Sequence, residues 1–343
     1  MMSKQRIGII GAGSFGTALA KVFYEAGNQV HVWAREPEIV AHINAHHVNP
    51  SYLSDLVLPD SVYAVEELSE LVQEKDLLVL ATPSHTLGDM ASRIKPLLSG
   101  NEVVITVSKG IEKDSFKTMS QVLVHVLDGV ISSDRIGVLS GPSHAEEVAH
   151  QKPTTVVATS YSTRTATYIQ DTCMTPMFRI YVNNDVAGVE IGGSVKNIMA
   201  IAAGVIDGAG WGDNTKAALI TRGLHEMKRM GAYFGAHTHT FSGLTGMGDL
   251  IVTCTSPHSR NRRLGQLIGE GKSLEEIIGG MEMVAEGVKT TQAVYFWAQK
   301  NSVEMPITSA VYQVLFEGVN PIDAMTQLMN RDPKQEGLQD IYS

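Results

Sequence analysis

The chain has 343 residues, about the length of two domains at roughly 150 residues each. Its 43% hydrophobic and 18% charged residues are typical of a globular protein and exclude an intrinsically disordered one. The net charge of −9 argues against a nucleic-acid or anionic-membrane binder, because such proteins carry a surplus of Lys and Arg.

Cysteine content and hydropathy indicate a cytoplasmic protein. Cys173 and Cys254 are too few for a disulfide framework or a metal cluster, so we expect a reducing compartment and no metal. The apolar stretch at residues 7–10 is shorter than the roughly 7–15 residues of a signal peptide. No segment approaches the roughly 18 uninterrupted apolar residues of a membrane span.

Short apolar, β-rich runs alternate with helical stretches in the first half of the chain. Several runs are apolar at successive positions, which is typical of strands covered on both faces. Strands separated by helices indicate crossover connections and a parallel sheet, at least for the first five. The expected strands are residues 7–10, 29–34, 77–81, 103–107, 136–139, 154–158 and 179–182.

The pattern changes near residue 184. Glycine and small apolar residues recur at helical spacing over residues 194–205, 215–233, 287–299 and 309–318, and no β-rich run is convincing. We therefore predict a doubly wound α/β domain over residues 1–183 and a mainly α-helical domain over residues 184–343.

A glycine motif follows the first predicted strand. Gly11, Gly13 and Gly16 form Gly-x-Gly-x-x-Gly, and a predicted helix over residues 17–26 comes next. In such motifs the first glycine permits a tight turn, the second lets the backbone approach a pyrophosphate, and the third allows close packing of helix on strand. With a strand before and a helix after, the motif predicts a Rossmann-like dinucleotide site instead of an inconsequential turn.

The residues after the second predicted strand bear on the choice of cofactor. An acid there binds the ribose 2′-hydroxyl of NAD, whereas an Arg accommodates the 2′-phosphate of NADP. The chain has Arg35 followed by Glu36. Because Arg35 comes first we favour tolerance of NADP, with NAD also possible; a solvated charge at a strand end is the alternative for Arg35.

Polar residues follow the next strands, at the edge where ligands of doubly wound sheets bind. Lys109 follows the strand at residues 103–107, where it could contact a phosphate or a carbonyl, or be solvated. Ser143 follows the strand at residues 136–139, and Ser143 with Glu146 matches a capping box. A capped helix N-terminus at this edge could also bind an anion or a hydroxyl group.

Two further candidates lie in the helical half. Lys196 stands beside Asn197 in a helix of small apolar residues, and since lysine is almost never buried unpaired, it extends to solvent or faces a cleft with partners. Ser259, Arg260 and Asn261 open a predicted helix with three guanidiniums in four residues. Such a helix start is a good receptor for a phosphate dianion, and an exposed basic turn is the alternative.

Taken in their order, these motifs resemble the bacterial NAD(P)-dependent glycerol-3-phosphate dehydrogenase family, from residue 7 to about residue 308. The matching segments are residues 7–20, 108–112, 139–145, 194–197, 243–250, 259–261 and 284–287. His85 and His144 stand where the family more often has apolar residues, and could tune affinity or pH response.

The resemblance implies reversible reduction of dihydroxyacetone phosphate to sn-glycerol 3-phosphate, the backbone supplier for phospholipid synthesis. It implies Lys196 as the proton donor or acceptor. The implied substrate contacts are Lys109, Gly141, Ser143, Lys196, Asp249, Ser259, Arg260 and Asn261. The cofactor contacts, with the motif glycines, are Gly11, Gly13, Ser14, Phe15, Gly16, Arg35, Lys109, Ala145, Arg260, Val284 and Glu286.

Two other functions remain open from the residues. One is a different two-domain dehydrogenase, for β-hydroxyacids or for UDP-sugars; the second class typically uses a catalytic cysteine. The other is a sensor that binds NAD(P)H without turnover. The small-residue helices of the second domain could pack within one chain or between two, so we expect a possible homodimer.

Overall fold

The computed structural model describes residues 4–280, 285–333 and 335–336. Two compact units divide the chain. The first comprises residues up to Lys109 together with Lys117–Val186, and the second comprises Gly110–Phe116 together with the chain from Ala187 onward. The short segment 110–116 lies within the range expected for the first domain but groups with the second unit.

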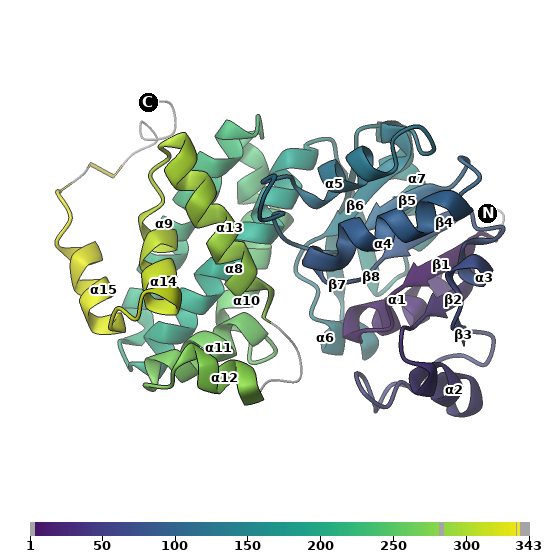
Figure 1. Ribbon diagram of the computed structural model, residues 1–343, viewed down its shortest axis with the longest axis horizontal. Helices are drawn as coiled ribbons and strands as arrows, with labels where there is room; N and C mark the ends of the chain where they lie inside the picture. Colours follow the sequence, from purple (N-terminus) through teal and green to yellow (C-terminus); the bar gives the residue numbers. More distant parts are fainter. Residues whose placement is uncertain (1–3, 281–284, 334, 337–343) are drawn as a thin grey trace. The chain divides into compact units, whose positions relative to one another are not determined.

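An eight-stranded sheet forms the centre of the first unit, in the order β3-β2-β1-β4-β5-β6-β7-β8 (Figure 1). Every neighbouring pair is parallel except β6 and β7. The first five predicted strands are therefore confirmed as parallel. The strands are β1 (Arg6–Ile10), β2 (Gln29–Trp33), β3 (Tyr63–Val65), β4 (Leu77–Leu80), β5 (Val103–Thr106), β6 (Ile136–Ser140), β7 (Thr154–Ser160) and β8 (Phe178–Asn183).

Helices cover both faces of this sheet. Successive residues of β4 alternate between two hydrophobic clusters: Leu77 and Val79 pack in one, and Leu78 and Leu80 in the other. The first cluster includes side chains of α1 (Ser14–Glu25), α2 (Pro37–His46), α6 (Ala145–Ala149) and α7 (Thr163–Cys173). The second includes side chains of α3 (Leu68–Val72), α4 (Leu87–Ile94) and α5 (Met119–Val126). Burial on both faces is the reason the strands read as continuous apolar runs.

The second unit is helical and is built around α8 (Val186–Gly208). By length and composition α8 could cross a membrane, but 89% of its most apolar window is buried inside the protein, as in a core helix. The other helices are α9 (Gly212–Tyr233), α10 (Asp249–Thr255), α11 (Arg260–Gly269), α12 (Leu274–Gly280), α13 (Glu286–Asn301), α14 (Pro306–Phe316) and α15 (Pro321–Met329).

Glycines bring α8 and α11 into backbone contact. A Cβ atom on Gly204 of α8 would lie 1.9 Å from the Arg262 carbonyl oxygen, and one on Gly265 of α11 would lie 1.9 Å from the Ile201 carbonyl oxygen. No side chain fits at either position. The glycine contacts lie in the C-terminal half of α8, and a hydrogen bond from Asn261 Nδ2 to Asn197 Oδ1 holds the start of α11 beside the residue that follows Lys196.

Candidate active site

The glycine motif folds as a tight turn between β1 and α1. Gly11 has φ +115°, and a Cβ on Gly16 would lie 2.0 Å from the Gly11 carbonyl oxygen. A Cβ on Gly13, in contrast, would meet nothing within 4 Å. No side chain caps α1, so its first-turn N–H groups remain as donors at this point. The turn therefore presents an open space lined by helix N–H groups.

These residues fit the pyrophosphate of a dinucleotide. The open position at Gly13 is where backbone must come close to the ligand, and the helix N-terminus favours an anion. Just after β4, close to Gly11, the buried Oγ1 of Thr82 has no hydrogen-bond partner among the residues that the structure describes. Buried polar groups are nearly always hydrogen-bonded, so this hydroxyl is suited to bond with a bound ligand.

Arg35 follows β2, with its side chain 80% exposed. Its Nε and Nη2 donate to Oε1 of Glu36 at 2.9 and 2.6 Å. An exposed pair of this kind contributes about 0–1 kcal/mol, so a bound 2′-phosphate would compete for the guanidinium. The geometry is compatible with both NADP and NAD.

Three predicted substrate residues of the first unit meet at one carbonyl group. The Lys109 ammonium and the Ser143 hydroxyl donate to the Gly141 carbonyl oxygen at 2.9 and 3.0 Å. Gly141 has φ +139°, a backbone conformation that favours glycine. A Cβ atom on it would lie 3.1 Å from Val156 Cα of β7. Lys109 therefore lies at the strand-end edge, as expected.

The predicted capping box at Ser143 is wrong. The N-cap of α6 is His144, one residue later, and no side chain caps this helix. The Ser143 hydroxyl donates to the Gly141 carbonyl oxygen, two residues earlier in the chain. Ala145, a predicted cofactor residue, is the first residue of α6.

Lys196 is buried in the second unit and is paired. Its ammonium donates to Oδ1 of Asp249 and, at 2.8 Å, to Oγ1 of Thr253. The side chains of Lys196 and Asp249 are only 7% and 1% exposed. Thr253 lies one turn after Asp249 on α10 and donates to the Asp249 carbonyl oxygen. Of the two alternatives for Lys196, extension into solvent is excluded.

The predicted phosphate-binding residues open α11. Ser259 is its N-cap and accepts from the Arg262 N–H at 3.2 Å, while exposed Arg260 is the first helical residue. Asn261 is buried; its Nδ2 donates to Oδ1 of Asn197 at 3.0 Å, and its Oδ1 accepts from the Gly287 N–H at 2.9 Å. These bonds connect α8, α11 and the start of α13.

One predicted cofactor residue opens α13. Glu286 is the first residue of this helix. Val284 lies outside the described residues.

Arg262 does not share the setting of Arg260. Its guanidinium pairs with Asp207 at 2.6 Å, and Asp207 also pairs with Lys216 of α9. These three side chains connect the end of α8 to α9 and α11. Of the three arginines at the start of α11, Arg262 therefore has a structural role.

Neither cysteine is a nucleophile in this structure. Cys173 and Cys254 are free and buried. Burial raises the pKa of the Cys254 thiol to about 12 and raises that of Cys173 as well. A thiolate at neutral pH is required for cysteine catalysis, so the geometry does not support a dehydrogenase that uses one.

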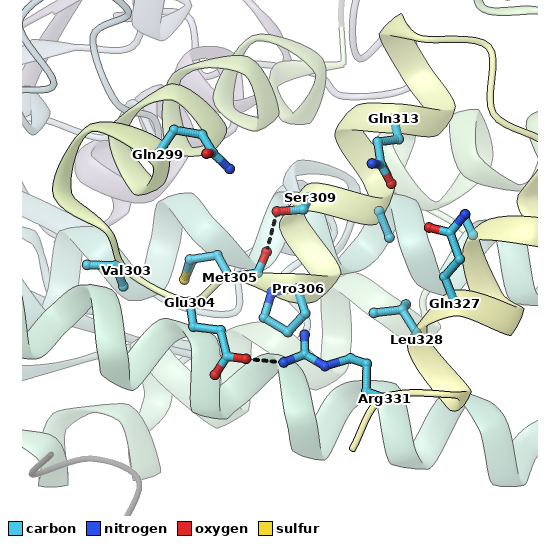
Figure 2. Close-up of a pocket in the computed structure, with 12 residues that line it drawn as sticks. Gln299, Val303, Glu304, Met305, Pro306, Ser309, Gln313, Gln327, Leu328 and Arg331 are labelled. Atoms are coloured by element: carbon cyan, nitrogen blue, oxygen red, sulfur yellow. Dashed lines mark hydrogen bonds and ion pairs between the residues drawn. The ribbon is translucent and has the colours of Figure 1, made fainter. Parts of the chain in front are cut away.

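A pocket of about 370 Å³ with a mixed polar and apolar lining lies among α13, α14 and α15 (Figure 2). An ion pair between Glu304 and Arg331 lies at its edge, and Ser309 donates to the Met305 carbonyl oxygen. Among the residues that line it are none of the predicted site residues. We therefore do not assign the chemistry to this pocket.

Sequence reasoning missed Thr253 as a member of the Lys196 cluster. A signal was present, since Asp249 and Thr253 are four residues apart in a predicted helical half and therefore share a helix face. Only the fold, however, shows that this face meets Lys196.

Comparison with known families gives a consistent result across the chain. A family model described as the N-terminus of NAD-dependent glycerol-3-phosphate dehydrogenase matches residues 6–166. A second model, described as the C-terminus of the same enzyme, matches residues 185–326.

Individual relatives match this chain over nearly their whole lengths. A glycerol-3-phosphate dehydrogenase (NAD(P)+) of Salinibacter ruber is 52% identical over 330 residues, which is 96% of each chain. One from Staphylococcus epidermidis is 48% identical and covers 97% of this chain and 100% of its own. The solved glycerol-3-phosphate dehydrogenase of Coxiella burnetii has a TM-score of 0.91 at 38% identity, covering 96% of this chain and 99% of its own.

Proposed function

The chain belongs to the NAD-dependent glycerol-3-phosphate dehydrogenase family, and on that premise we propose how its own residues carry out the reaction. The protein is an oxidoreductase that uses NAD(P) to interconvert dihydroxyacetone phosphate and sn-glycerol 3-phosphate. The observation that carries the proposal is the buried cluster of Lys196, Asp249 and Thr253.

Lys196 is the proton donor for ketone reduction and the acceptor in the reverse direction. When bound, the reduced nicotinamide supplies the two electrons and the hydrogen that go to the carbonyl carbon. Negative charge then develops on the carbonyl oxygen, and an ammonium stabilises it both by its charge and by transfer of a proton. Asp249 offsets the cost of burying this ammonium, and Thr253 fixes its direction.

Arg260 and Asn261 hold the substrate phosphate at the start of α11, with Ser259 shaping the helix N-terminus. A guanidinium and helix N–H groups together suit a phosphate dianion. Binding energy from this remote group would orient the carbonyl for reaction. Asn261 is already fixed by Asn197 and Gly287, so little side-chain entropy is lost when substrate binds.

The first unit supplies the remaining contacts. We assign Lys109, Gly141 and Ser143 to the substrate, because they converge on one carbonyl group at the ends of β5 and β6. We assign the glycine turn with Ser14 and Phe15 to the cofactor pyrophosphate and Arg35 to its ribose. Ala145, Lys109, Arg260, Val284 and Glu286 are proposed as further cofactor contacts.

The product supplies the backbone of glycerophospholipids in this proposal, and the protein works in the cytoplasm as a homodimer. Two buried free thiols suit a reducing compartment. The dimer is proposed from partly exposed aromatic side chains on α13 and α14, where Phe296 and Phe316 are 42% and 38% exposed. Light scattering of the purified protein tests it, and a monomer mass would contradict it.

The reaction is tested with dihydroxyacetone phosphate and either NADPH or NADH, followed by absorbance at 340 nm. We expect oxidation of the reduced cofactor that depends on the triose phosphate. Binding of NADPH without oxidation would favour a nucleotide sensor instead. Oxidation of the reduced cofactor with a keto acid, but not with the triose phosphate, would favour a β-hydroxyacid dehydrogenase.

A further inference from the structure

Asn49 lies in the segment between α2 and β3, far along the chain from the glycine turn, yet it contacts that turn directly. Its side chain is completely buried. Its Nδ2 donates to the carbonyl oxygen of Ala12 at 2.7 Å and to Oγ1 of Thr17 at 2.9 Å. Its Oδ1 accepts from the Ser51 N–H at 3.3 Å. The amide of Asn49 is therefore held from its own segment and directed at the turn.

The position of the Ala12 carbonyl group determines where the next N–H group points. In a trans peptide, the carbonyl of one residue and the N–H of the next point in opposite directions. No cis peptide occurs in the described chain. Holding the Ala12 oxygen inward on Asn49 thus turns the Gly13 N–H outward. Gly13 is the position at which a Cβ would meet nothing within 4 Å.

Thr17 extends this arrangement into α1. It is 1% exposed, lies in the first turn of the helix, and its hydroxyl is within 3.4 Å of the same Ala12 oxygen. Asn49 and Thr17, from two separate parts of the chain, thus both donate to the Ala12 carbonyl oxygen. A turn rich in glycine is flexible by itself, so its shape depends on such contacts.

We infer that Asn49 is a positioning residue for the cofactor phosphate site. It holds the Ala12 carbonyl so that the Gly13 N–H is preorganised for the pyrophosphate of NAD(P)H. The inference rests on the proposed function, because it assigns the glycine turn to that pyrophosphate. Asn49 itself contacts no cofactor in this account and acts through the backbone.

Asn44 provides a matched control. It lies on α2, close to Asn49 in sequence, and makes a similar pair of bonds: its Nδ2 donates to the Ala64 carbonyl oxygen at 2.9 Å, and its Oδ1 accepts from the Ala64 N–H at 2.8 Å. These bonds attach α2 to β3 and do not involve the glycine turn. Asn44→Ala therefore removes comparable hydrogen bonds from the same region of the chain.

The test measures the dissociation constant of NADPH by fluorescence titration, with melting temperature and steady-state constants for each variant. We expect Asn49→Ala to weaken NADPH binding about tenfold, because the Ala12 oxygen loses its donor, and Asn49→Asp to weaken it further, because a buried carboxylate also repels that oxygen. The KM for NADPH should rise by the same factor, with the KM for dihydroxyacetone phosphate within about twofold of wild type. Asn44→Ala should lower the melting temperature and leave NADPH binding unchanged.

Two outcomes would overturn the inference: folded Asn49 variants that bind NADPH as wild type does, or an equal loss of binding in Asn44→Ala. Should Asn49→Ala fail to fold, Thr17→Val decides, since it removes the second contact to Ala12 with little change of shape. It should weaken NADPH binding several-fold, and unchanged binding would refute the inference. Because binding is measured without turnover, failure of the proposed reaction would show separately, as a wild-type protein that binds NADPH but does not oxidise it.

Discussion

The ammonium of Lys196 on α8 and the carboxylate of Asp249 on α10 form an ion pair inside the helical unit, across 53 residues of chain. Breaking one partner of a buried pair costs about 3–5 kcal/mol, because the other charge is left uncompensated. This pair therefore holds α8 against α10 as well as setting the position of the proposed proton donor. Substitutions at either residue will combine a structural and a chemical effect.

Two of the three glycines of the motif, Gly13 and Gly16, should respond differently to substitution by alanine. At Gly16 a Cβ would lie 2.0 Å from the Gly11 carbonyl oxygen, so Gly16→Ala should lower the melting temperature markedly. At Gly13 a Cβ would enter open space, so Gly13→Ala should fold normally but weaken NADPH binding about tenfold or more, because the methyl group occupies the pyrophosphate position. Calorimetry and cofactor titration measure the two effects. Normal NADPH binding by Gly13→Ala would move the pyrophosphate elsewhere.

Arg260→Ala should chiefly weaken the binding of the phosphate-bearing substrate. Loss of a charged hydrogen bond of about 1.5–3 kcal/mol corresponds to a KM for dihydroxyacetone phosphate raised about 10- to 150-fold. Because Arg260 is also a proposed cofactor contact, the comparison is made with NADPH saturating for each protein. Dihydroxyacetone, which lacks the phosphate, should then be reduced equally slowly by wild type and variant. Arg263→Ala, one turn further along the same helix and also exposed, serves as the control. An unchanged KM in Arg260→Ala would refute the proposed phosphate site.

Glu226 should make stability depend on pH. This residue of α9 is buried, and its carboxylate accepts from the N–H groups of Ile307 and Thr308 at the start of α14. Burial raises its pKa from the ordinary 4.5 to about 7. Between these values the folded protein binds more protons here than the unfolded chain, so this contribution to the free energy of unfolding decreases as pH rises.

Glu226→Gln removes that titration. Urea unfolding of both proteins at pH 5 and pH 7 should show the wild type losing stability relative to the variant as pH rises. A difference in free energy of unfolding that stays constant between the two pH values would contradict the assignment.

Strands were predictable from the sequence where burial imposes an uninterrupted apolar run. β4 and β5 match their predictions to within one residue, because every residue in them is buried. β3 was missed, since Tyr63–Val65 is too short to form a recognisable run and Tyr63 is exposed. Among helices, α11 was predicted only from its basic start, although its buried residues Asn261, Leu264, Gly265 and Ile268 recur at helical spacing.

Site residues were predictable where the chemistry is local. The glycine turn reads directly from Gly11 to Gly16, because strand, turn and helix are consecutive in sequence. Asn49 and Thr253 could not be identified in this way, because each contacts a residue 32 to 57 positions away. The spacing of Asp249 and Thr253 indicates a shared helix face, but only the fold shows that this face meets Lys196. The capping role of Ser143 was predicted wrongly because α6 begins one residue later than the Ser-x-x-Glu pattern indicates, so that His144 and not Ser143 is its N-cap.

The most direct test is the turnover of Lys196→Met with saturating NADPH and dihydroxyacetone phosphate. Because this variant removes the ammonium that pairs with the buried Asp249 carboxylate, the double variant Lys196→Met with Asp249→Asn is measured beside it, and both are checked for NADPH binding. We predict turnover reduced on the order of 10²-fold or more in each, with NADPH bound as tightly as in wild type. Turnover close to wild type in a folded, NADPH-binding variant would remove Lys196 from the chemistry and contradict the account.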